Sequence, residues 1–279
     1  FSPGCMGSMA WSGFRPLADF ADVRDRDGTR FADALSHHLA AEADIPRRPL
    51  GHRPHAYIEA HIEQGPRLER ENQDVGIVTG IQGSRWFSVT LTGETAHAGT
   101  MPLALRRDAV QDMVRAISAL NVLMHDPADV LRFTVGKVEV APNSSNSVAD
   151  RATFSIDLRH PDAAVLLPRG DAIPGVIQAA VRNAGVEVRE TFHALPVTFD
   201  AMVVDALERA AGAVGVRHIR LPSGAFHDAQ FVVPICPTGM IFVPSRDGVS
   251  HNPAEYSTSA QLAAGTRVLT QALLDLASA

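Results

Sequence analysis

The fold of the middle of the chain can be predicted from three stretches: "VLRFTVGKVEV" (130–140), "APNSSNSVAD" (141–150) and "ATFSIDLR" (152–159). The first and third alternate apolar and polar residues, which is the period of a half-buried β-strand. The stretch between them is polar, and its Pro and Asn residues suit a connection. We therefore predict that the two strands pair as a hairpin.

The segments around this hairpin extend it into a complete unit. A β-rich strand (85–93) and a helix (103–125) come before it, and an amphipathic helix (171–185) ending at Gly185 and a last strand (186–193) come after it. The order β-α-β-β-α-β is the split pattern of a ferredoxin-like α+β domain.

The sequence on both sides of this unit has a different character. Helical patterns alternate with short apolar strands such as "AYIEAHI" and "TGMIFVPS", which is typical of an α/β domain. We predict a discontinuous α/β domain formed by residues 1–83 plus 197–279, with an inserted domain of residues 84–196.

Composition excludes several classes of protein. The net charge is −6 and the basic residues are scattered, so we predict no nucleic-acid partner. No apolar run approaches the roughly 20 residues that span a bilayer, and no targeting segment is visible. We therefore predict no membrane association and a cytoplasmic location. The two cysteines, Cys5 and Cys236, are too few for a disulfide framework, which favours free buried thiols.

Four histidines lie at strand ends or in loops among small and polar residues: His61, His97, His227 and His251. Imidazole is the commonest side-chain metal ligand and the usual acid or base near neutral pH. For each of them alone, a hydrogen-bonded structural histidine is the more frequent role.

Two polar residues of the inserted domain are also candidates for a functional role. Asn146 lies in the hairpin connection, and Arg159 ends the strand "FSIDLR". Arginine can hold a carboxylate through two parallel hydrogen bonds. The alternative for Arg159 is an ordinary ion pair with Asp157 or Asp162. No HExxH, CxxC, GxSxG or phosphate-binding glycine loop is present.

The motifs "HIEQGP" (61–66), "AHAGTMP" (96–102) with "RRDA" (106–109), "PNSSNSV" (142–148), "PSGAFHDAQ" (222–230) and "SHNPAE" (250–255) together resemble the M20-type metalloamidases. This family contains N-carbamoyl-L-amino-acid hydrolases, β-ureidopropionases and allantoate amidohydrolases. The resemblance covers almost the whole chain. It implies a dinuclear-metallohydrolase-type α/β domain with a ferredoxin-like lid that also forms a homodimer.

The resemblance also implies roles for individual residues. His61 and His251 match ligands to two different metals. His97 matches a lid histidine that reaches into the active site of the other subunit, where it would stabilise the oxyanion of the reaction. The remaining matches are implied to bind the substrate, with Arg159 taking its carboxylate: Gln64, Asn146, Arg159, Gly224 and His227.

The implied chemistry is metal-assisted hydrolysis of a small-molecule ureido acid. Two divalent ions, Zn or Mn and alternatively Co or Ni, activate water, and a glutamate beside a metal-ligand glutamate acts as general base. An N-carbamoyl-L-amino acid would yield the amino acid, ammonia and carbon dioxide. Allantoate and β-ureidopropionate are alternative substrates, and a dipeptide is a further one.

The sequence departs from the family pattern at its start. The family's first metal histidine with its aspartate, the bridging aspartate and the paired glutamates would lie upstream of the position that Phe1 matches. We therefore expect an N-terminally truncated chain that is inactive alone. The alternative from another class is a non-catalytic ligand-binding or dimerisation protein.

Overall fold

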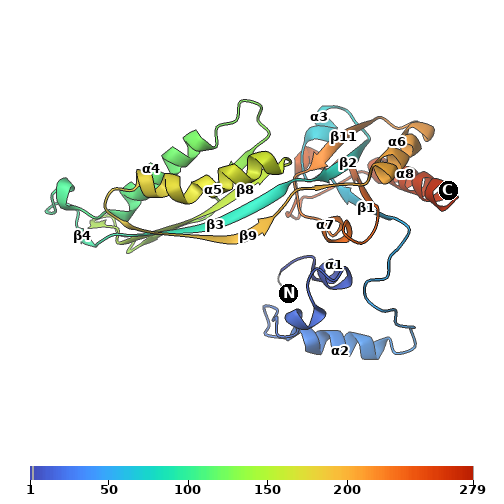
Figure 1. The fold of residues 1–279 in the computed structure, drawn as a ribbon, viewed down its shortest axis with the longest axis horizontal. Coiled ribbons are helices and arrows are strands. Elements are labelled where there is room, and N and C mark those ends of the chain that lie inside the picture. Colours follow the sequence, from blue (N-terminus) through green and yellow to red (C-terminus); the bar gives the residue numbers. More distant parts are fainter. Residues whose placement is uncertain (2, 279) are drawn as a thin grey trace. The chain divides into compact units, whose positions relative to one another are not determined.

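The computed structural model describes Phe1 and residues 3–278, and it divides into two compact units. The split unit comprises Phe1–Ile81 with Val197–Ala279, and the inserted unit comprises Gln82–Pro196. The insertion predicted from the sequence, residues 84–196, begins two residues later than this unit. Both units contain helices and strands (Figure 1).

The inserted unit has a main antiparallel sheet with two helices on one face, and a small two-stranded sheet formed by β4 (Ala96–His97) and β7 (Ser147–Val148) (Figure 1). Its sheet order is β5-β8-β3-β9, and β6 also pairs with β8. The elements are β3 (Gly83–Thr92), α4 (Ala109–Leu123), β5 (Arg132–Thr134), β6 (Val138–Ala141), β8 (Arg151–His160), α5 (Ala163–Ala180) and β9 (Gly185–Ala194). The predicted hairpin is confirmed, since β6 pairs antiparallel with β8. The chain order β-α-β-β-α-β confirms the predicted ferredoxin-like fold class.

The core of the inserted unit contains every second side chain of its central strands. Phe87, Val89 and Leu91 of β3 are buried, as are the alternate residues Phe154 and Ile156 of β8. Helix α4 adds Met113 and Leu120 at helical spacing, whereas Val114 of the same helix is 52% exposed. The helix predicted for residues 103–125 is therefore confirmed, although α4 begins later, at Ala109.

The prediction for the second helix was wrong at both ends. Helix α5 begins at Ala163, where the side chain of Asp162 accepts the Ala164 N–H at its N-terminus, and it ends at Ala180. Gly185 is not a helix stop but the first residue of β9. The reason is a contact distant in sequence, because the buried Asp112 carboxylate accepts the backbone N–H groups of residues 182–184 and holds them in a turn.

The split unit has a mixed sheet. Strand β1 (Tyr57–Ile62) is parallel to β12 (Thr238–Val243), which is antiparallel to β2 (Val75–Ile81). Strand β2 also pairs with β11 (His218–Ser223) and β10 (Val197–Thr198). Helices α6 (Ala201–Ala213) and α8 (Ser259–Ala277) pack on β12 through the main core cluster.

Short elements complete the chain. A satellite cluster formed by Met9, Ala10, Phe20 and Phe231 packs α1 against α7. The elements are α1 (Met6–Trp11), η1 (Leu17–Phe20), α2 (Phe31–Ala41), α3 (Arg67–Arg70), β4 (Ala96–His97), η2 (Leu103–Leu105), β7 (Ser147–Val148), α7 (Ala229–Val232) and η3 (Arg246–Gly248).

Two further predictions can be compared with the structure. Cys236 is buried and Cys5 is half-buried, and both are free thiols. Over Phe1 and residues 3–278, no helix has the length and apolar character needed to cross a membrane.

Candidate active site

One face of strand β1 carries three polar side chains. Tyr57, Glu59 and His61 point to the same side because side chains alternate along a strand. The His227 ring lies beside them, with its centroid 4.7 Å from that of His61 in an edge-to-face arrangement. The structure therefore brings together His61 and His227, two of the residues selected from the sequence.

His227 is held as a neutral, buried imidazole. Its Nε2 lies 2.7 Å from the Ser223 hydroxyl, and its Nδ1 lies 3.8 Å from Glu59 Oε1. Among the described residues, this Nδ1 has no hydrogen-bond partner. Burial, followed by the charge of His61, lowers the pKa of His227 to about 4. A neutral ring with an unpaired buried nitrogen is suited to contact a ligand.

Glu59 is a residue that the sequence analysis missed. Its Oε2 accepts the Ala229 N–H at 2.8 Å and the Tyr57 hydroxyl at 3.2 Å. Burial raises the pKa of the Glu59 carboxyl despite these bonds. The signal was present in the sequence, since Tyr57, Glu59 and His61 are spaced two apart on a predicted strand.

His61 has a defined hydrogen bond. Its Nδ1 lies 2.8 Å from the Ile62 carbonyl oxygen, and a carbonyl can only accept, so Nδ1 is the donor. In the neutral ring the Nε2 lone pair is then available, as metal-ligating histidines require.

A second cluster joins the loop after β1 to the loop after β12. Gln64 Nε2 donates to the Ser250 hydroxyl at 2.7 Å and lies 3.3 Å from His251 Nε2. Both Gln64 and His251 have left-handed backbone conformations, with φ of 56° and 55°. Such conformations are costly for residues other than glycine and concentrate at functional sites. The structure therefore brings Gln64 and His251, two of the candidates from the sequence, together in one cluster.

Close backbone contacts hold these two loops together. Gly248 has φ +68°, and a Cβ atom there would lie 2.7 Å from the Gly65 carbonyl carbon. The Asp247 N–H donates to Glu69 Oε2 at 2.7 Å. Gly224, the remaining candidate of the split unit, lies in the exposed segment between β11 and His227.

The described residues do not fit a complete dinuclear metal centre. His61 and His251 could each supply one nitrogen. Within residues 1 and 3–278, however, no group of three or more His, Cys, Asp or Glu side chains is arranged to hold a metal ion. Metal sites in proteins usually need at least three protein ligands, so no catalytic step through a metal is derived from these residues.

The inserted unit brings His97 and Asn146 together. Strand β4, which contains His97, pairs with β7, and the Ala98 N–H donates to the Asn146 carbonyl oxygen at 2.9 Å. The Gly99 N–H donates to His97 Nδ1 at 3.0 Å. Because Nδ1 is an acceptor, the neutral ring carries its proton on Nε2 and presents an N–H donor there.

Asn146 is also oriented. Its Oδ1 accepts the Ser144 hydroxyl at 2.8 Å, so its Nδ2 group is the part that can donate to a ligand. His97 and Asn146 therefore present two exposed donor groups from adjacent segments.

Arg159 lies elsewhere in the inserted unit and is engaged by Asp157. Its Nε and Nη2 donate to the two Asp157 oxygens at 2.9 and 2.6 Å. This is the ion pair that the sequence analysis gave as the alternative role. Arg159 and Asp157 are 25% and 31% exposed, so a ligand carboxylate that binds Arg159 would compete with Asp157 for its guanidinium.

Arg159 is far from His97 and Asn146 within one chain. Arg151 pairs with Thr92 at the end of the sheet that leads into β4, and Arg159 pairs with Ser84 at the other end. Eight residues along a strand span about 27 Å. Figure 1 shows β4 at one end of the long β3–β8 ribbon. The structure therefore does not bring Arg159 to the other two candidates in the same inserted unit.

Comparisons with known proteins agree with this architecture. The profile of peptidase family M20/M25/M40 matches residues 8–275. The allantoate amidohydrolase of Escherichia coli (strain K12) is 37% identical over 275 residues, covering 97% of this chain and 66% of that protein. The N-carbamoyl-L-amino acid amidohydrolase of Geobacillus stearothermophilus is 37% identical over 283 residues, covering 99% and 68%.

A solved structure is similar as well. The amidase of the hydantoinase/carbamoylase family from Burkholderia multivorans superposes with a TM-score of 0.88 and 38% sequence identity, covering 99% of this chain and 67% of that one. The chain spans about two thirds of the length of the curated relatives that it matches. The chain belongs to peptidase family M20/M25/M40, and its relatives include ureido amidohydrolases and amidases of the hydantoinase/carbamoylase type.

Proposed function

We propose that this chain carries the substrate-binding part of a metal-dependent amidohydrolase that cleaves a linear ureido C–N bond of an N-carbamoyl-L-amino acid. The products are the amino acid, ammonia and carbon dioxide. The observation that carries the proposal is the pair His97 and Asn146, which presents two oriented hydrogen-bond donors. Relatives named N-carbamoyl-L-amino-acid amidohydrolase and allantoate amidohydrolase support it.

Each of the candidate residues has a separate proposed role in hydrolysis of such a substrate. Water adds to the ureido carbonyl, and its oxygen gains negative charge. The Nε2–H of His97 donates to that oxygen and stabilises it more in the transition state than in the substrate. The Asn146 amide donates to the substrate, and Arg159 binds its carboxylate after Asp157 is displaced. Gln64, Gly224 and His227 line the substrate site in the split unit.

Two copies of the chain complete one site. Arg159 lies about 27 Å along the sheet from the β4–β7 pair, too far for one small substrate to contact both in one inserted unit. Exposed valines support a second copy covering this unit, since Val114 and Val122 of α4 and Val138 of β6 are 50% to 78% exposed. We propose a homodimer in which His97 of one copy serves the substrate held by Arg159 of the other.

The metal ions are also part of the proposal. Amidohydrolases of this family generally depend on two metal ions, and His61 and His251 are the proposed ligands of this chain, one for each ion. Zn or Mn are the proposed metals, with Co or Ni as alternatives. For a chimera of this chain with the unmatched part of a ureido amidohydrolase relative, dialysis against a chelator should abolish turnover. Adding back each metal ion separately then identifies the metal that the enzyme uses.

The experiment that tests the function uses a chimera. The part of a ureido amidohydrolase relative that this chain does not match is joined to the 279-residue chain, and ammonia release is measured with a substrate panel. The panel contains N-carbamoyl-L-amino acids, their D isomers, allantoate, β-ureidopropionate and a dipeptide. We expect turnover of N-carbamoyl-L-amino acids by the chimera and none by the 279-residue chain alone.

Other outcomes of this panel have definite meanings. Preferred turnover of allantoate or β-ureidopropionate would keep the ureido amidohydrolase class and replace the substrate. Binding of N-carbamoyl amino acids by a dimer without any turnover, in a metal-loaded chimera, would favour the non-catalytic binding protein. Turnover by the 279-residue chain alone would contradict the assignment of the metal and base residues to the part of the relatives that this chain does not match.

A further inference from the structure

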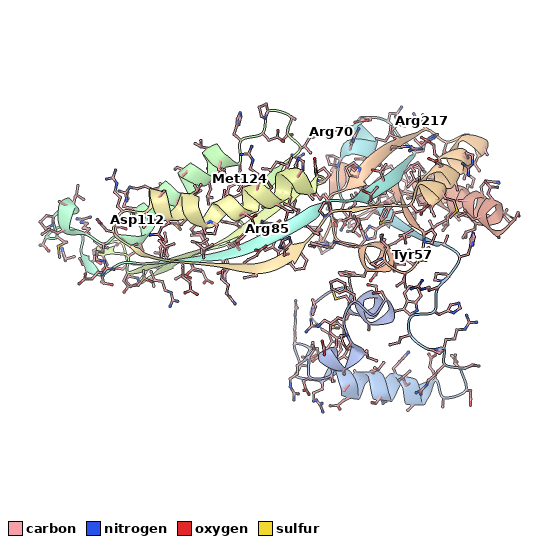
Figure 2. The ribbon with its side chains drawn as sticks, in the orientation of Figure 1. Tyr57, Arg70, Arg85, Asp112, Met124 and Arg217 are labelled. Atoms are coloured by element: carbon pink, nitrogen blue, oxygen red, sulfur yellow. The ribbon has the colours of Figure 1, made fainter. Side chains whose placement is uncertain are left out.

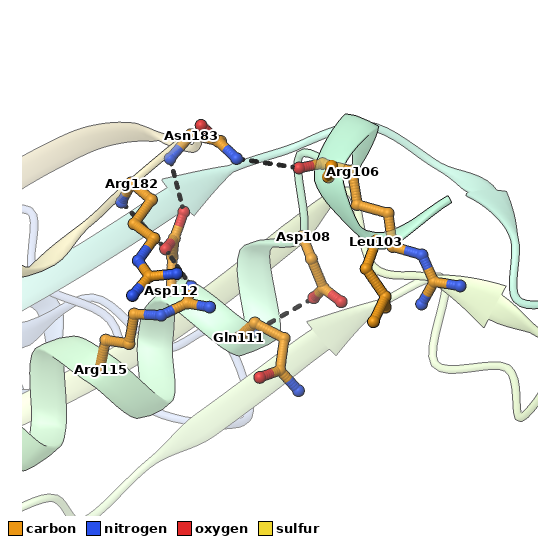
Figure 3. Close-up of a pocket in the computed structure, with 9 residues that line it drawn as sticks. Leu103, Arg106, Asp108, Gln111, Asp112, Arg115, Arg182 and Asn183 are labelled. Carbon is orange, nitrogen blue, oxygen red and sulfur yellow. Dashed lines mark hydrogen bonds and ion pairs between the residues drawn. The ribbon is translucent and has the colours of Figure 1, made fainter. Parts of the chain in front are cut away.

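A cavity of about 570 Å³ in the inserted unit has none of the candidate site residues named above in its lining. It is formed by the segment before α4, the first turns of α4 and the turn between α5 and β9, and Figure 3 shows the side chains around it. Its volume falls within the range of small-molecule sites. Three arginines and two aspartates line it: Arg106, Arg115, Arg182, Asp108 and Asp112.

The two aspartates are already occupied by the protein's own N–H groups. Asp108 caps helix α4 by accepting the N–H groups of Val110 and Gln111, each at 3.1 Å. Asp112 is 1% exposed and accepts the backbone N–H groups of residues 182–184 at 2.9 to 3.0 Å. The pKa of Asp112 is lowered because these hydrogen bonds outweigh its burial. Both carboxylates are therefore turned toward the backbone.

The arginines, in contrast, keep most of their donors. Arg106 donates only to the carbonyl oxygens of Met101 and Ala98, at 2.9 and 2.6 Å, which bear no formal charge. Arg115 uses Nη1 for Asp112 at 2.7 Å. In the described part of the chain, no acceptor lies on the Arg182 guanidinium, and Figure 3 shows both Arg182 and Arg115 among the side chains that line the cavity.

We propose that this cavity is a binding site for a small dianion. The formal charge of the lining is +1, from three arginines and two aspartates, and the aspartates are already satisfied. A guanidinium matches a carboxylate or a phosphate through two parallel hydrogen bonds. Arg182 and the part of Arg115 that Asp112 does not use supply guanidinium N–H groups in the lining, and the Gln111 side chain supplies an amide at the cavity wall. The shared ligand chemistry is a pair of oxyanion charges on a small molecule.

Calorimetric titration of the 279-residue chain tests this proposal. Inorganic phosphate and succinate are titrated in separate arms, which distinguish a phosphoryl from a dicarboxylate ligand. Succinamide, the neutral analogue of succinate, is the ligand control. We expect saturable binding of at least one dianion, with a dissociation constant on the order of 1 mM or tighter, weakened by added salt.

Three variants locate the site. Arg182→Gln should weaken binding about tenfold without changing the melting temperature, because its exposed guanidinium has no acceptor among the described residues. Gln111→Glu, which places a third carboxylate in the cavity, should weaken binding at least as much. Arg189→Gln, at an exposed position of β9, removes the same charge elsewhere and should leave binding within about twofold.

Three results would overturn the proposal. One is the absence of saturable binding for both phosphate and succinate. Another is equal weakening by Arg182→Gln and Arg189→Gln, which would indicate general electrostatic attraction. The third is binding of succinamide as tight as that of succinate, which would show that charge does not select the ligand.

Discussion

His97 derives its proposed role from one hydrogen bond to its own chain. The Gly99 N–H occupies Nδ1, so the proton of the neutral ring is on Nε2, where a donor is needed. In the ureido-hydrolysing chimera, we predict that His97→Ala lowers kcat by about 10²–10³-fold, because removal of one oxyanion donor typically has that effect. KM should change by less than about threefold, because the contact strengthens only in the transition state.

His125 supplies the matched control for this prediction. It lies just beyond helix α4 and is exposed, so His125→Ala should leave kcat and KM unchanged. Steady-state ammonia release measures both variants. A His97→Ala enzyme that changes only KM would show that His97 binds the substrate and not the transition state.

At this scale, the sequence predicted the residue types but not all of their partners. His61 and His227 were selected separately, and the structure places their rings 4.7 Å apart. Glu59 could have been found, because it is two residues from His61 on a strand. Ser223 could not, because its contact with His227 depends on how the loop after β11 folds back. The Asp157 partner of Arg159 was foreseen as an alternative.

The loop that carries His251 depends on a glycine at position 248. We predict that Gly248→Ala lowers the free energy of unfolding by about 2–3 kcal/mol, because φ is positive and the new Cβ would meet the backbone of Gly65 at 2.7 Å. Gly215→Ala is the matched control, since Gly215 has φ +69° with nothing within 4 Å. It should cost only about 1 kcal/mol.

Urea unfolding of the two glycine variants checks this difference. Equal losses at positions 248 and 215 would show that the two loops can separate without cost. The proposed fixed arrangement of Gln64 beside His251 would then lose its structural basis.

Asp112 links helix α4 to the turn before β9. Figure 2 labels this residue in the inserted unit. We predict that Asp112→Asn lowers the free energy of unfolding by about 2 kcal/mol at neutral pH, because an amide cannot accept all three N–H groups as strongly. The folded pKa of Asp112 is lowered. Its stabilisation is therefore present above the unfolded pKa of about 3.9 and is lost as pH falls through the lower folded value.

Denaturant titrations from pH 3 to pH 8 measure this effect. The gap between the wild type and Asp112→Asn should be constant above about pH 5 and should narrow in acid. Glu187→Gln, at an exposed position of β9, is the control and should show no comparable gap. A gap that stays constant into acid would contradict a charge-based role for Asp112.

Element prediction succeeded where patterns are local. Alternation in 130–140 and 152–159 predicted a pairing that β6 and β8 confirm. The end of α5 was predicted wrongly because Asp112, about 70 residues away in the sequence, holds the turn that follows the helix. Strands β2 and β11 were not predicted, since their parallel pairing is set by tertiary contacts. Local reading of the sequence cannot supply such contacts.

At the scale of the whole molecule, the proposed site needs two copies of the chain. Arg159 and His97 lie at opposite ends of the inserted sheet, and exposed valines remain on α4 and β6. Val122 of α4 is 78% exposed. We predict that Val122→Glu in the chimera converts the dimer to a monomer and also abolishes turnover. Light scattering and ammonia release measure the two effects, and an active monomer would contradict a shared site.

Complementation between two inactive variants of the chimera measures directly whether two copies of the chain share one site. His97→Ala and Arg159→Ala chains are refolded separately and then together, and hydrolysis of an N-carbamoyl-L-amino acid is followed. In an equal mixture of the two chains, half of all dimers are heterodimers, and one of the two sites in each heterodimer is intact. Activity should therefore return to about one quarter of the wild type. If the mixture stays as inactive as each variant alone, the site is not shared between copies and the account is wrong.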